Sequence, residues 1–388
     1  MSSGAEQRRR ILCISFSDIN RDARVLRQLD VLAELGDVTT VGYGEQPAAA
    51  AEHLAIDESL PSLPQTPVGV AMLALRRYDW VELNAPAVRA VPPLVGDRRF
   101  DVIVANEARA MAVATRIAGG APVVADMHEW APEERTHVLS WRLLVKPFMI
   151  HQCRKYLPKM AAVTVVNDSI GQLYLERFGV HTHTVRNASA YRELGPSEMT
   201  PGRIRLVHSG GAVPGRNIEA LIEAVRGLDA KFTLDLYLVP GRDGGRYLYS
   251  IRKLIADEQR ITLHPPVTPA ELVDTLNAYD VGIYALPPLT PNHRLALPNK
   301  IFDFIQARLA VVFATAQETD RLISEHELGV IVPDATAGAM RNTLAALSEH
   351  DVSVYKQNVD TAAKVLNSAE DSAMVRTVVG NLLNGTAG

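Results

Sequence analysis

The sequence predicts an α/β protein with two domains, each built around a parallel sheet. Short apolar runs recur along the chain, and most are followed by a polar loop and an amphipathic helix, the alternation typical of parallel sheets. The alternation restarts after residues 189–202, a stretch with two prolines and two glycines that we interpret as an interdomain linker. A chain of 388 residues is long enough for two full cores.

Both halves begin with a predicted strand and continue with alternating helices and strands. The predicted strands lie at residues 11–16, 38–43, 101–105, 123–126 and 162–166 in the first half, and at 204–208, 232–238, 261–264, 281–284 and 311–314 in the second. Residues 44–68, rich in Ala and Pro, are predicted to form a loop. Residues 354–383 are predicted to be helical and to contain no strand.

The loop after the first strand is polar but lacks the glycine-rich fingerprint of dinucleotide-binding proteins, which argues against an oxidoreductase. Asp22 and Arg24 stand where the next helix begins. Two roles stay open for them, helix capping and contact with a ligand.

Composition and charge narrow the class of protein. The net charge is −4 and 47% of residues are hydrophobic, so no overall charge attracts nucleic acid or an anionic membrane. Cys13 and Cys153 lie in apolar or helical contexts, which predicts free thiols in a reducing compartment. The apolar run at 11–16 is too short for a signal peptide, and no stretch is long enough to span a membrane. We therefore expect a cytoplasmic protein with no nucleic-acid partner.

Residues 295–307, LALPNKIFDFIQA, are the most informative stretch. After an irregular Pro-rich loop, apolar residues recur at helical spacing, so a helix is predicted to begin with Pro298 in its first turn. Free amides and the helix dipole make this helix start a natural anion-binding site, and Lys300 adds a positive charge. Asp303 lies one turn further along the same face. These residues either hold a nucleotide diphosphate and its ribose, or form a solvated Lys–Asp pair on a capped helix.

Residues 299–312, Asn-Lys-Ile-Phe-Asp-Phe-Ile-Gln-Ala-x-x-Ala-Val-Val, resemble the donor-binding signature of family-4 glycosyltransferases. These are retaining enzymes with the GT-B fold, in which two Rossmann-like domains face each other across a cleft and the C-terminal helix crosses back to the first domain. The resemblance implies an acceptor-side domain at 1–190, a nucleotide-sugar-binding domain at 191–365 and a returning helix at 366–388.

The resemblance also implies roles for single residues. Lys300, together with the backbone near Pro298 and Asn299, would bind the donor diphosphate. Asp303, in place of the usual Glu, would bind the ribose hydroxyls.

The most serious departure from the family pattern concerns the residue that contacts the sugar. A Glu eight residues before the ribose-binding carboxylate usually contacts the sugar, and this chain has Leu295 there. Asn292, His293 or Arg294 would have to take its place.

A glycine-rich loop at 209–217 follows the first strand of the second half. Its small residues let a ligand approach the backbone amides, and Arg216 offers a planar fork for a phosphate. The loop resembles the family's G-R-x-x-x-x-K-G element, which implies that Gly210, Gly211 and Arg216 contact the donor. Gly211 stands where Arg is usual and Arg216 where Lys is usual, so one of two expected cations is absent.

Residues 126–132 follow a predicted strand, where open α/β sheets place their ligands. Asp126-Met127-His128-Glu129 resembles the family's D-x-H-E segment. The resemblance implies that His128 lies beside the transferred sugar, with Glu129 as a partner. A structural hydrogen bond is the alternative role for a histidine at a strand end.

Residues 138–160 combine aromatic and apolar side chains with five cations. Pro147 is expected to kink or split the helix. Two interpretations stay open for this segment. It makes peripheral contact with the inner face of the membrane, or it is a core helix with a solvated basic edge.

The resemblance, together with these patterns, implies a hexosyltransferase that moves a sugar from a nucleotide-diphosphate sugar to an acceptor hydroxyl with retention of configuration. Arg216, Lys300 and the helix start would stabilise the leaving diphosphate, and His128 and Glu129 complete the predicted catalytic set. Apart from the donor substrate we expect no cofactor and no metal, and the acceptor is a glycan, a glycolipid or a small metabolite. A GT-B-fold sugar-nucleotide epimerase and a weakly active nucleotide-sugar-binding subunit are the alternatives.

Overall fold

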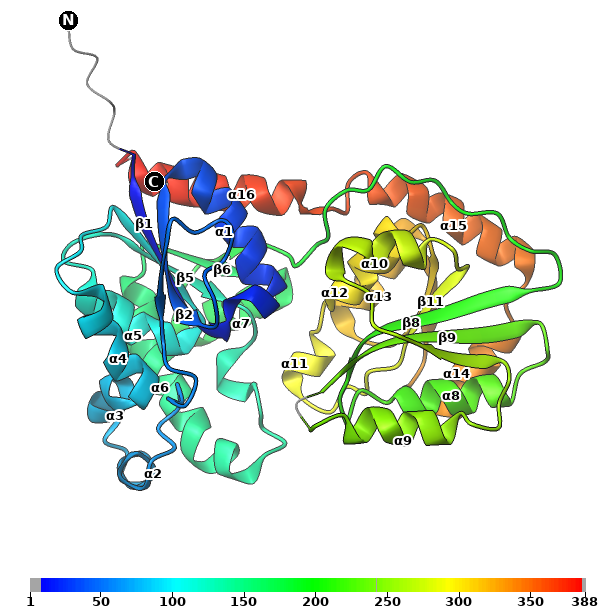
Figure 1. Cartoon of the computed structure of the whole chain (residues 1–388), viewed down its shortest axis with the longest axis horizontal. Helices are drawn as coiled ribbons and strands as arrows, with labels where there is room; N and C mark the ends of the chain where they lie inside the picture. The colour runs from blue at the N-terminus through cyan, green and yellow to red at the C-terminus, as the bar shows by residue number, and fades with distance from the viewer. Residues whose placement is uncertain (1–7, 242, 386–388) are drawn as a thin grey trace, which may run out of the picture. The chain divides into compact units, whose positions relative to one another are not determined.

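The computed structural model describes residues 8–241 and 243–385, which divide into two compact units (Figure 1). Unit 1 contains the chain up to Arg186 and again from Glu370 onward, and unit 2 contains Asn187–Ala369. Each unit has one parallel sheet with helices on both faces, so the predicted fold class is confirmed. Within the described ranges, no helix is long and apolar enough to cross a membrane.

The sheet of unit 1 has seven parallel strands in the order β3-β2-β1-β4-β5-β6-β7. The strands are β1 (Arg10–Asp18), β2 (Asp37–Tyr43), β3 (Glu52–Ala55), β4 (Val102–Asn106), β5 (Val123–Met127), β6 (Ala162–Val165) and β7 (His183–Thr184). The order reverses between β1 and β4, and open α/β sheets bind ligands beside such a reversal, at the carboxyl ends of the strands.

The helices of unit 1 cover both faces of this sheet. They are α1 (Ala23–Leu35), α2 (Pro67–Ala74), α3 (Tyr78–Asn84), α4 (Pro86–Val95), α5 (Ala108–Ile117), α6 (Lys146–Tyr156), α7 (Asp168–Phe178) and α16 (Ser368–Leu383), with short turns η1 (Ile19–Arg21), η2 (Ala131–Glu133), η3 (Trp141–Val145) and η4 (Leu157–Lys159). In β1, Ile11 and Cys13 pack with α1 and α16, whereas Leu12 and Ile14 pack with α4 and α5. The C-terminal helix is therefore part of the first core, as expected.

Unit 2 repeats the same strand order with six parallel strands, β10-β9-β8-β11-β12-β13. They are β8 (Ile204–Ala212), β9 (Phe232–Pro240), β10 (Ile261–His264), β11 (Val281–Tyr284), β12 (Ala310–Ala314) and β13 (Gly329–Val332). Here the order reverses between β8 and β11, which places the carboxyl ends of these two strands at the expected ligand-binding edge.

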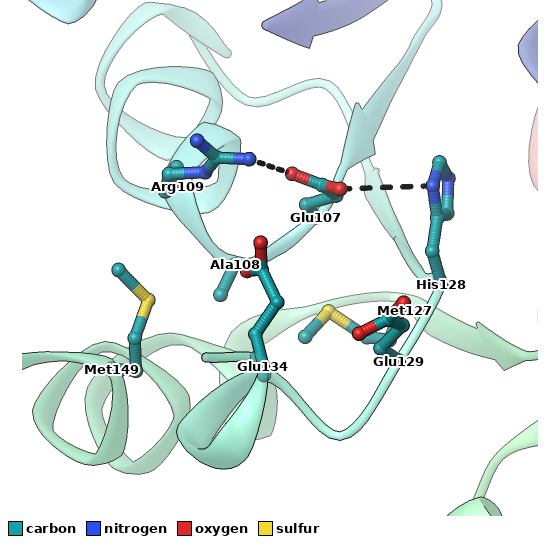
Figure 2. Close-up of a pocket in the computed structure, with 9 residues that line it drawn as sticks. Glu107, Ala108, Arg109, Met127, His128, Glu129, Glu134 and Met149 are labelled. Carbon is teal, nitrogen blue, oxygen red and sulfur yellow. Dashed lines mark hydrogen bonds and ion pairs between the residues drawn. The ribbon is translucent and has the colours of Figure 1, made fainter. Parts of the chain in front are cut away.

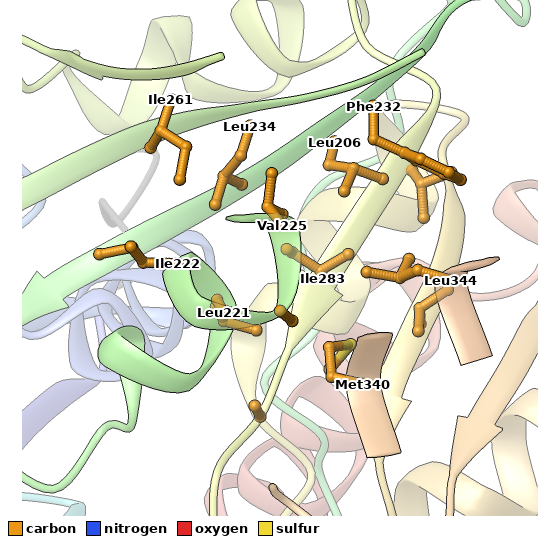
Figure 3. Close-up of a cluster of buried hydrophobic side chains, with 14 of the residues drawn as sticks. Leu206, Leu221, Ile222, Val225, Phe232, Leu234, Ile261, Ile283, Met340 and Leu344 are labelled. Atoms are coloured by element: carbon orange, nitrogen blue, oxygen red, sulfur yellow. The ribbon is translucent and has the colours of Figure 1, made fainter. Parts of the chain in front are cut away.

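Two layers of helices enclose the second sheet. They are α8 (Ile218–Arg226), α9 (Arg246–Leu254), α10 (Pro269–Leu276), α11 (Pro291–Arg294), α12 (Asn299–Gln306), α13 (Gln317–His326), α14 (Ala337–Ala345) and α15 (Glu349–Ala363). Figure 3 shows the core on one face, where residues of α8 and α14 pack against the strands around Leu206, Leu234 and Ile283. A second cluster on α10, α12, α13 and α15 includes Phe302.

The structure corrects several local predictions. The predicted loop at 44–68 contains β3 and the first residues of α2. Strand β8 continues to Ala212, so Gly210 and Gly211 are strand residues and the loop proper begins after them. A short helix, α11, interrupts the Pro-rich loop, and Pro298 is the N-cap of α12 instead of a first-turn residue.

Other predictions of local structure are confirmed. Thr268 and Glu271 form the capping box of α10. Pro147 separates a π-helical turn, η3, from α6 and lies in the first turn of α6. Cys13 and Cys153 are free and buried.

Candidate active site

Lys300 lies at the ligand-binding edge of the second sheet. It is the second residue of α12, and its ammonium lies 5.7 Å from the ring centroid of Tyr284, the last residue of β11. The side chain is half-buried, and in the described part of the chain its ammonium has no hydrogen-bond or ion-pair partner. Burial and the nearby charge of Arg216 lower the pKa of Lys300 to about 8, although Asp303 acts in the opposite direction. An anion at this position would meet a cation that the protein itself leaves unneutralised.

Gly210 makes room for this lysine. Its φ angle is +138°, a value that residues with side chains rarely adopt. A Cβ atom on Gly210 would lie 2.4 Å from Cε and 2.5 Å from Nζ of Lys300. Gly211 differs, because a Cβ atom there would meet only Val213 at 3.4 Å, an ordinary contact distance.

Arg216 is the second cation of this edge. Its Nη1 donates to the hydroxyl of Tyr284 at 3.2 Å, and most of its side chain is exposed. The next residue, Asn217, has left-handed backbone angles and donates through Nδ2 to the carbonyls of Ala285 (3.0 Å) and Ala335 (2.6 Å). These two bonds fix the loop that carries Arg216 against the end of β11.

His208 belongs to the same edge but was not selected from the sequence. It is 1% exposed, and its ring is parallel to that of Tyr284 with centroids 6.0 Å apart. Burial and the charges of Lys300 and Arg216 lower the pKa of His208 to about 4, so the ring is neutral at pH 7. Nδ1 lies 2.9 Å from the carbonyl of Ile283 and is therefore the protonated nitrogen. The sequence feature that could have identified His208 is its position directly before the Ser-Gly-Gly sequence at the end of β8.

The remaining donor-site candidates lie before and along α12. Asp303 accepts a hydrogen bond from the hydroxyl of Ser189 at 2.5 Å, and Asn299 is the first residue of the helix. Asn292 and His293 lie on α11, where Asn292 is buried and Nδ1 of His293 lies 3.1 Å from the carbonyl of Pro287. The ring of His293 is therefore tied to its own loop.

His128 lies in unit 1, directly after β5, beside a cavity of about 150 Å³. Figure 2 shows Glu107, Arg109, Glu134 and Met149 around the same space. Nε2 of His128 is 3.2 Å from Oδ2 of Asp126 and 3.2 Å from Oδ1 of Asn106. Burial lowers the pKa of His128, but the hydrogen bond and charge of Asp126, together with Glu107, outweigh burial and raise it above its ordinary value.

Glu107 is the residue that sequence reasoning missed in unit 1. It follows β4, its carboxylate pairs with Arg109, and one carboxylate oxygen lies 3.8 Å from Nδ1 of His128 (Figure 2). Burial raises the pKa of Glu107, but the charges of Arg109 and His128 dominate and hold it below its ordinary value. Its place after the predicted strand at 101–105 was the signal available in the sequence.

The other polar residues named from the first half have structural contacts. Asp22 caps α1 by accepting from the amide of Val25 at 3.2 Å. Arg24 is buried and makes two hydrogen bonds to Asp126, at 2.9 and 2.5 Å. Glu129 lines the cavity, and its backbone carbonyl accepts from the hydroxyl of Tyr174 at 2.9 Å. Helix capping, one of the two roles left open, is therefore confirmed for Asp22, whereas Arg24 pairs with a buried carboxylate and does not cap the helix.

One group in the described chain has the spacing of metal ligands, namely Asp79, Glu82 and His151. Lys155 donates to Asp79 at 2.7 Å and to Glu82 at 2.6 Å. The lysine ammonium thus already supplies the positive charge between these carboxylates.

Known proteins share this fold. Residues 24–188 match the model of Glycosyltransferase Family 4. Among solved structures, HepE from Anabaena is 13% identical, with 97% of this chain and 100% of that chain covered and a TM-score of 0.66. Sucrose-phosphate synthase from Thermosynechococcus elongatus is 15% identical over 97% and 100% of the two chains, with a TM-score of 0.70. A glycosyltransferase from Rickettsia africae is 12% identical over 97% and 98%, with a TM-score of 0.66.

The comparison with curated protein sequences found no significant match. The fold and the solved structures assign the chain to the GT-B class, because both units, and their order along the chain, are those of GT-B proteins. Within that class, the chain resembles the family-4 glycosyltransferases, as its sequence motifs predicted.

Proposed function

We propose that this protein is a retaining glycosyltransferase that moves a sugar from a nucleotide-diphosphate sugar to an acceptor hydroxyl. The observation that carries the proposal is the unneutralised ammonium of Lys300 at the helix start beside Arg216. Placing a cation in the first turn of a helix is unfavourable by a few tenths of a kcal/mol, so a bound anion would compensate. Solved structures of HepE contain UDP and glucose or UDP-glucose, which supports a nucleotide sugar as the donor here.

The chemical task of this site is to stabilise the departing diphosphate. Lys300, Arg216 and the free amides of α12 are donors with fixed positions, and such preorganised donors are effective where charge develops in a transition state. Because these groups supply the positive charge, we propose that transfer needs no divalent metal. Activity that persists in excess EDTA would support this, and activity restored only by added Mg²⁺ or Mn²⁺ would contradict it.

Asp303 is proposed to bind the ribose hydroxyls. One of its carboxylate oxygens already accepts from Ser189, which orients the group on the helix. Gly210 and Gly211 are proposed to let the phosphates approach the backbone, and Asn292 and His293 to replace the missing Glu at the sugar. Retention would follow from attack on the same face of the sugar that the phosphate leaves.

In unit 1, His128 and Glu129 are proposed to take part in transfer, with the cavity at the ends of β4 and β5 as the acceptor pocket. Its volume of about 150 Å³ suits one sugar-sized or smaller group, and its lining of carboxylates can accept hydrogen bonds from hydroxyls. The acceptor is therefore proposed to present a hydroxyl-bearing group of a glycan, glycolipid or small metabolite.

The test begins with a thermal-shift screen of nucleotide sugars, since a ligand that binds only the folded protein raises its apparent stability. With the donor so found, Lys300→Ala is expected to lower transfer at least about tenfold, equivalent to about 1.4 kcal/mol. Lys364→Ala changes an exposed lysine of unit 2 and is the matched control. Transfer that is unchanged in Lys300→Ala would refute the phosphate assignment. Nucleoside diphosphate released at the full rate without any acceptor would favour the epimerase.

We also propose peripheral contact with the inner face of the membrane through the segment around η3. Leu139 and Leu143 are 58% and 63% exposed, and α2, which packs against η3, is followed by Leu75 at 69%. The exposed cations Arg142 and Arg76 lie beside these side chains in the sequence. Apolar side chains with basic neighbours are typical of surfaces that bind anionic bilayers.

Cosedimentation with vesicles tests this contact. The protein is expected to bind vesicles containing phosphatidylglycerol, and Leu139→Glu with Leu143→Glu to abolish the binding. Val365→Glu alters an apolar side chain of unit 2 that is 52% exposed and should leave binding unchanged. A wild-type protein that stays in the supernatant with anionic vesicles would contradict the proposal.

A further inference from the structure

Glu107 has an unusual backbone conformation for a residue with a side chain. Its φ angle is +66° and its ψ angle +163°, a region that is essentially occupied by glycine alone. Asn217 and Glu327 also have positive φ angles, but both lie in the left-handed helical region, which other residues do enter. Such strain persists only where surrounding contacts impose it, and it concentrates at functional sites.

The contacts around Glu107 show what the strain achieves. Its amide donates to the carbonyl of Asp126 at 2.8 Å, which joins the end of β4 to the end of β5. Its side chain makes no capping hydrogen bond to α5, although it occupies the N-cap position. The carboxylate is instead held by Arg109 on one oxygen and faces His128 with the other (Figure 2). The backbone conformation therefore serves the cavity and not the helix.

His128 consequently faces acidic groups on both sides of its ring. Nε2 is 3.2 Å from Asp126, and Nδ1 is 3.8 Å from Glu107. Arg24, from α1, opposes a charge on the ring but is itself paired with Asp126. Asn106, at the end of β4, adds a neutral amide oxygen 3.2 Å from Nε2. Two carboxylates aimed at the two nitrogens favour the form in which both nitrogens carry a proton.

We propose that Glu107 is a positioning residue that, together with Asp126, keeps His128 as a doubly protonated imidazolium. His128 would then act in transfer as a hydrogen-bond-donating cation and not as a general base. This inference rests on the proposed function for the role of His128 in transfer, but the protonation of the ring can be measured without any substrate.

The pH dependence follows from the sign of the shift. A histidine whose pKa is raised stays charged to a higher pH, and its contribution to activity is lost as the pH rises through that raised pKa. Glu107→Gln removes one of the two carboxylates and keeps the size of the side chain. The pKa of His128 should therefore fall by roughly one pH unit, the lower end of the range for a neighbouring opposite charge.

The experiment is an NMR titration of the His128 ring in the full-length protein, assigned by its loss in a His128→Gln variant. Glu107→Gln is expected to shift the titration to lower pH, and the alkaline limb of the pH profile of kcat/KM should move with it. Glu134→Gln is the control for the titration, because it neutralises another carboxylate of the same cavity that pairs with Arg135. An unchanged His128 titration in Glu107→Gln would overturn the proposal.

A second pair of variants tests the backbone argument. Glu107→Gly and Glu107→Ala both lack the carboxylate, and only glycine tolerates these backbone angles, so the glycine variant should unfold at the higher temperature. The reverse order would mean that the strain is not present in solution and would also count against the proposal. If the titration shifts as expected but no nucleotide sugar supports transfer, the proposed function fails while the assignment of His128 as a cation stands.

Discussion

Replacing Gly210 with Ala is expected to weaken nucleotide binding without removing any charged group. The new Cβ would overlap Cε and Nζ of Lys300, at 2.4 and 2.5 Å. The end of a lysine side chain is flexible, so the overlap is relieved by moving the ammonium. The position that is lost is the one proposed to contact the diphosphate.

Two separate effects determine how strongly Gly210→Ala should change nucleotide affinity and folding stability. Hydrogen bonds to charged groups contribute about 1.5–3 kcal/mol, so losing this contact should weaken nucleoside diphosphate binding roughly 10- to 100-fold. Independently, alanine at a φ angle of +138° is strained, and strain of this kind costs on the order of 1–3 kcal/mol of folding stability. The affinity loss should therefore come with a lower unfolding temperature.

A matched variant separates the two effects. Gly244 also has a positive φ angle, +73°, but a Cβ there would meet nothing within 4 Å. Gly244→Ala should reproduce the loss of stability and leave UDP affinity, measured by calorimetry, at the wild-type value. If Gly210→Ala binds UDP as tightly as wild type, or if both variants weaken binding equally, the reasoning about Lys300 is wrong.

Three further outcomes are expected. Lys300→Met should flatten the rise in stability of the unliganded protein between about pH 8 and 10.5, because there the unfolded chain binds more protons than the folded one; urea unfolding across this range measures the effect. Arg24→Met should cost about 3 kcal/mol in urea unfolding, the lower end of the range for breaking a buried pair, because it removes the guanidinium partner of the buried Asp126 and leaves that carboxylate with His128 alone as a charged neighbour, and a cost below about 1 kcal/mol would contradict that account. Gly211→Arg should strengthen UDP binding in calorimetry by roughly tenfold, since a Cβ there would meet only Val213 at an ordinary distance and the arginine restores the cation usual in the family. Unchanged affinity would show that the missing cation is not limiting.

Sequence periodicity predicted most of the fold because each element carries its own pattern. Most strands contain a short apolar run or alternate buried with partly covered residues, and the helix before β12 places Ile301, Phe302 and Ile305 in the core at regular spacing. Strand β3 was missed because its four residues are only partly covered or exposed, so it has no apolar run to detect. The pairing of β3 with β2 depends on the neighbouring strands, and a short window of the sequence does not contain this information.

The two candidate sites were predicted unequally for the same reason. Lys300 and Arg216 stand in motifs that resemble a known family, so they could be named from the sequence. Arg24 and Asp126 are 102 positions apart, and only the fold makes their contact. Glu107 and His208 were missed, because the significance of each lies in contacts with residues distant in the sequence.

Three residues that break local rules, Gly210, Lys300 and Glu107, lie near the carboxyl ends of the strands beside each strand-order reversal. In unit 2, Lys300 is a cation in the first turn of a helix, and Gly210 adopts a φ angle that only glycine accepts readily. In unit 1, Glu107 adopts a backbone conformation that glycine accepts more readily. Its side chain makes no capping hydrogen bond to α5, so a glycine at this position would take no hydrogen bond from the helix. Folding alone favours a neutral residue at position 300 and a glycine at position 107. At both positions the chain has the residue that is less favourable for folding, a lysine and a glutamate. The charge of each side chain lies at the ligand-binding edge of its sheet. We therefore expect the function of this protein to require a charged residue at each of these two edges.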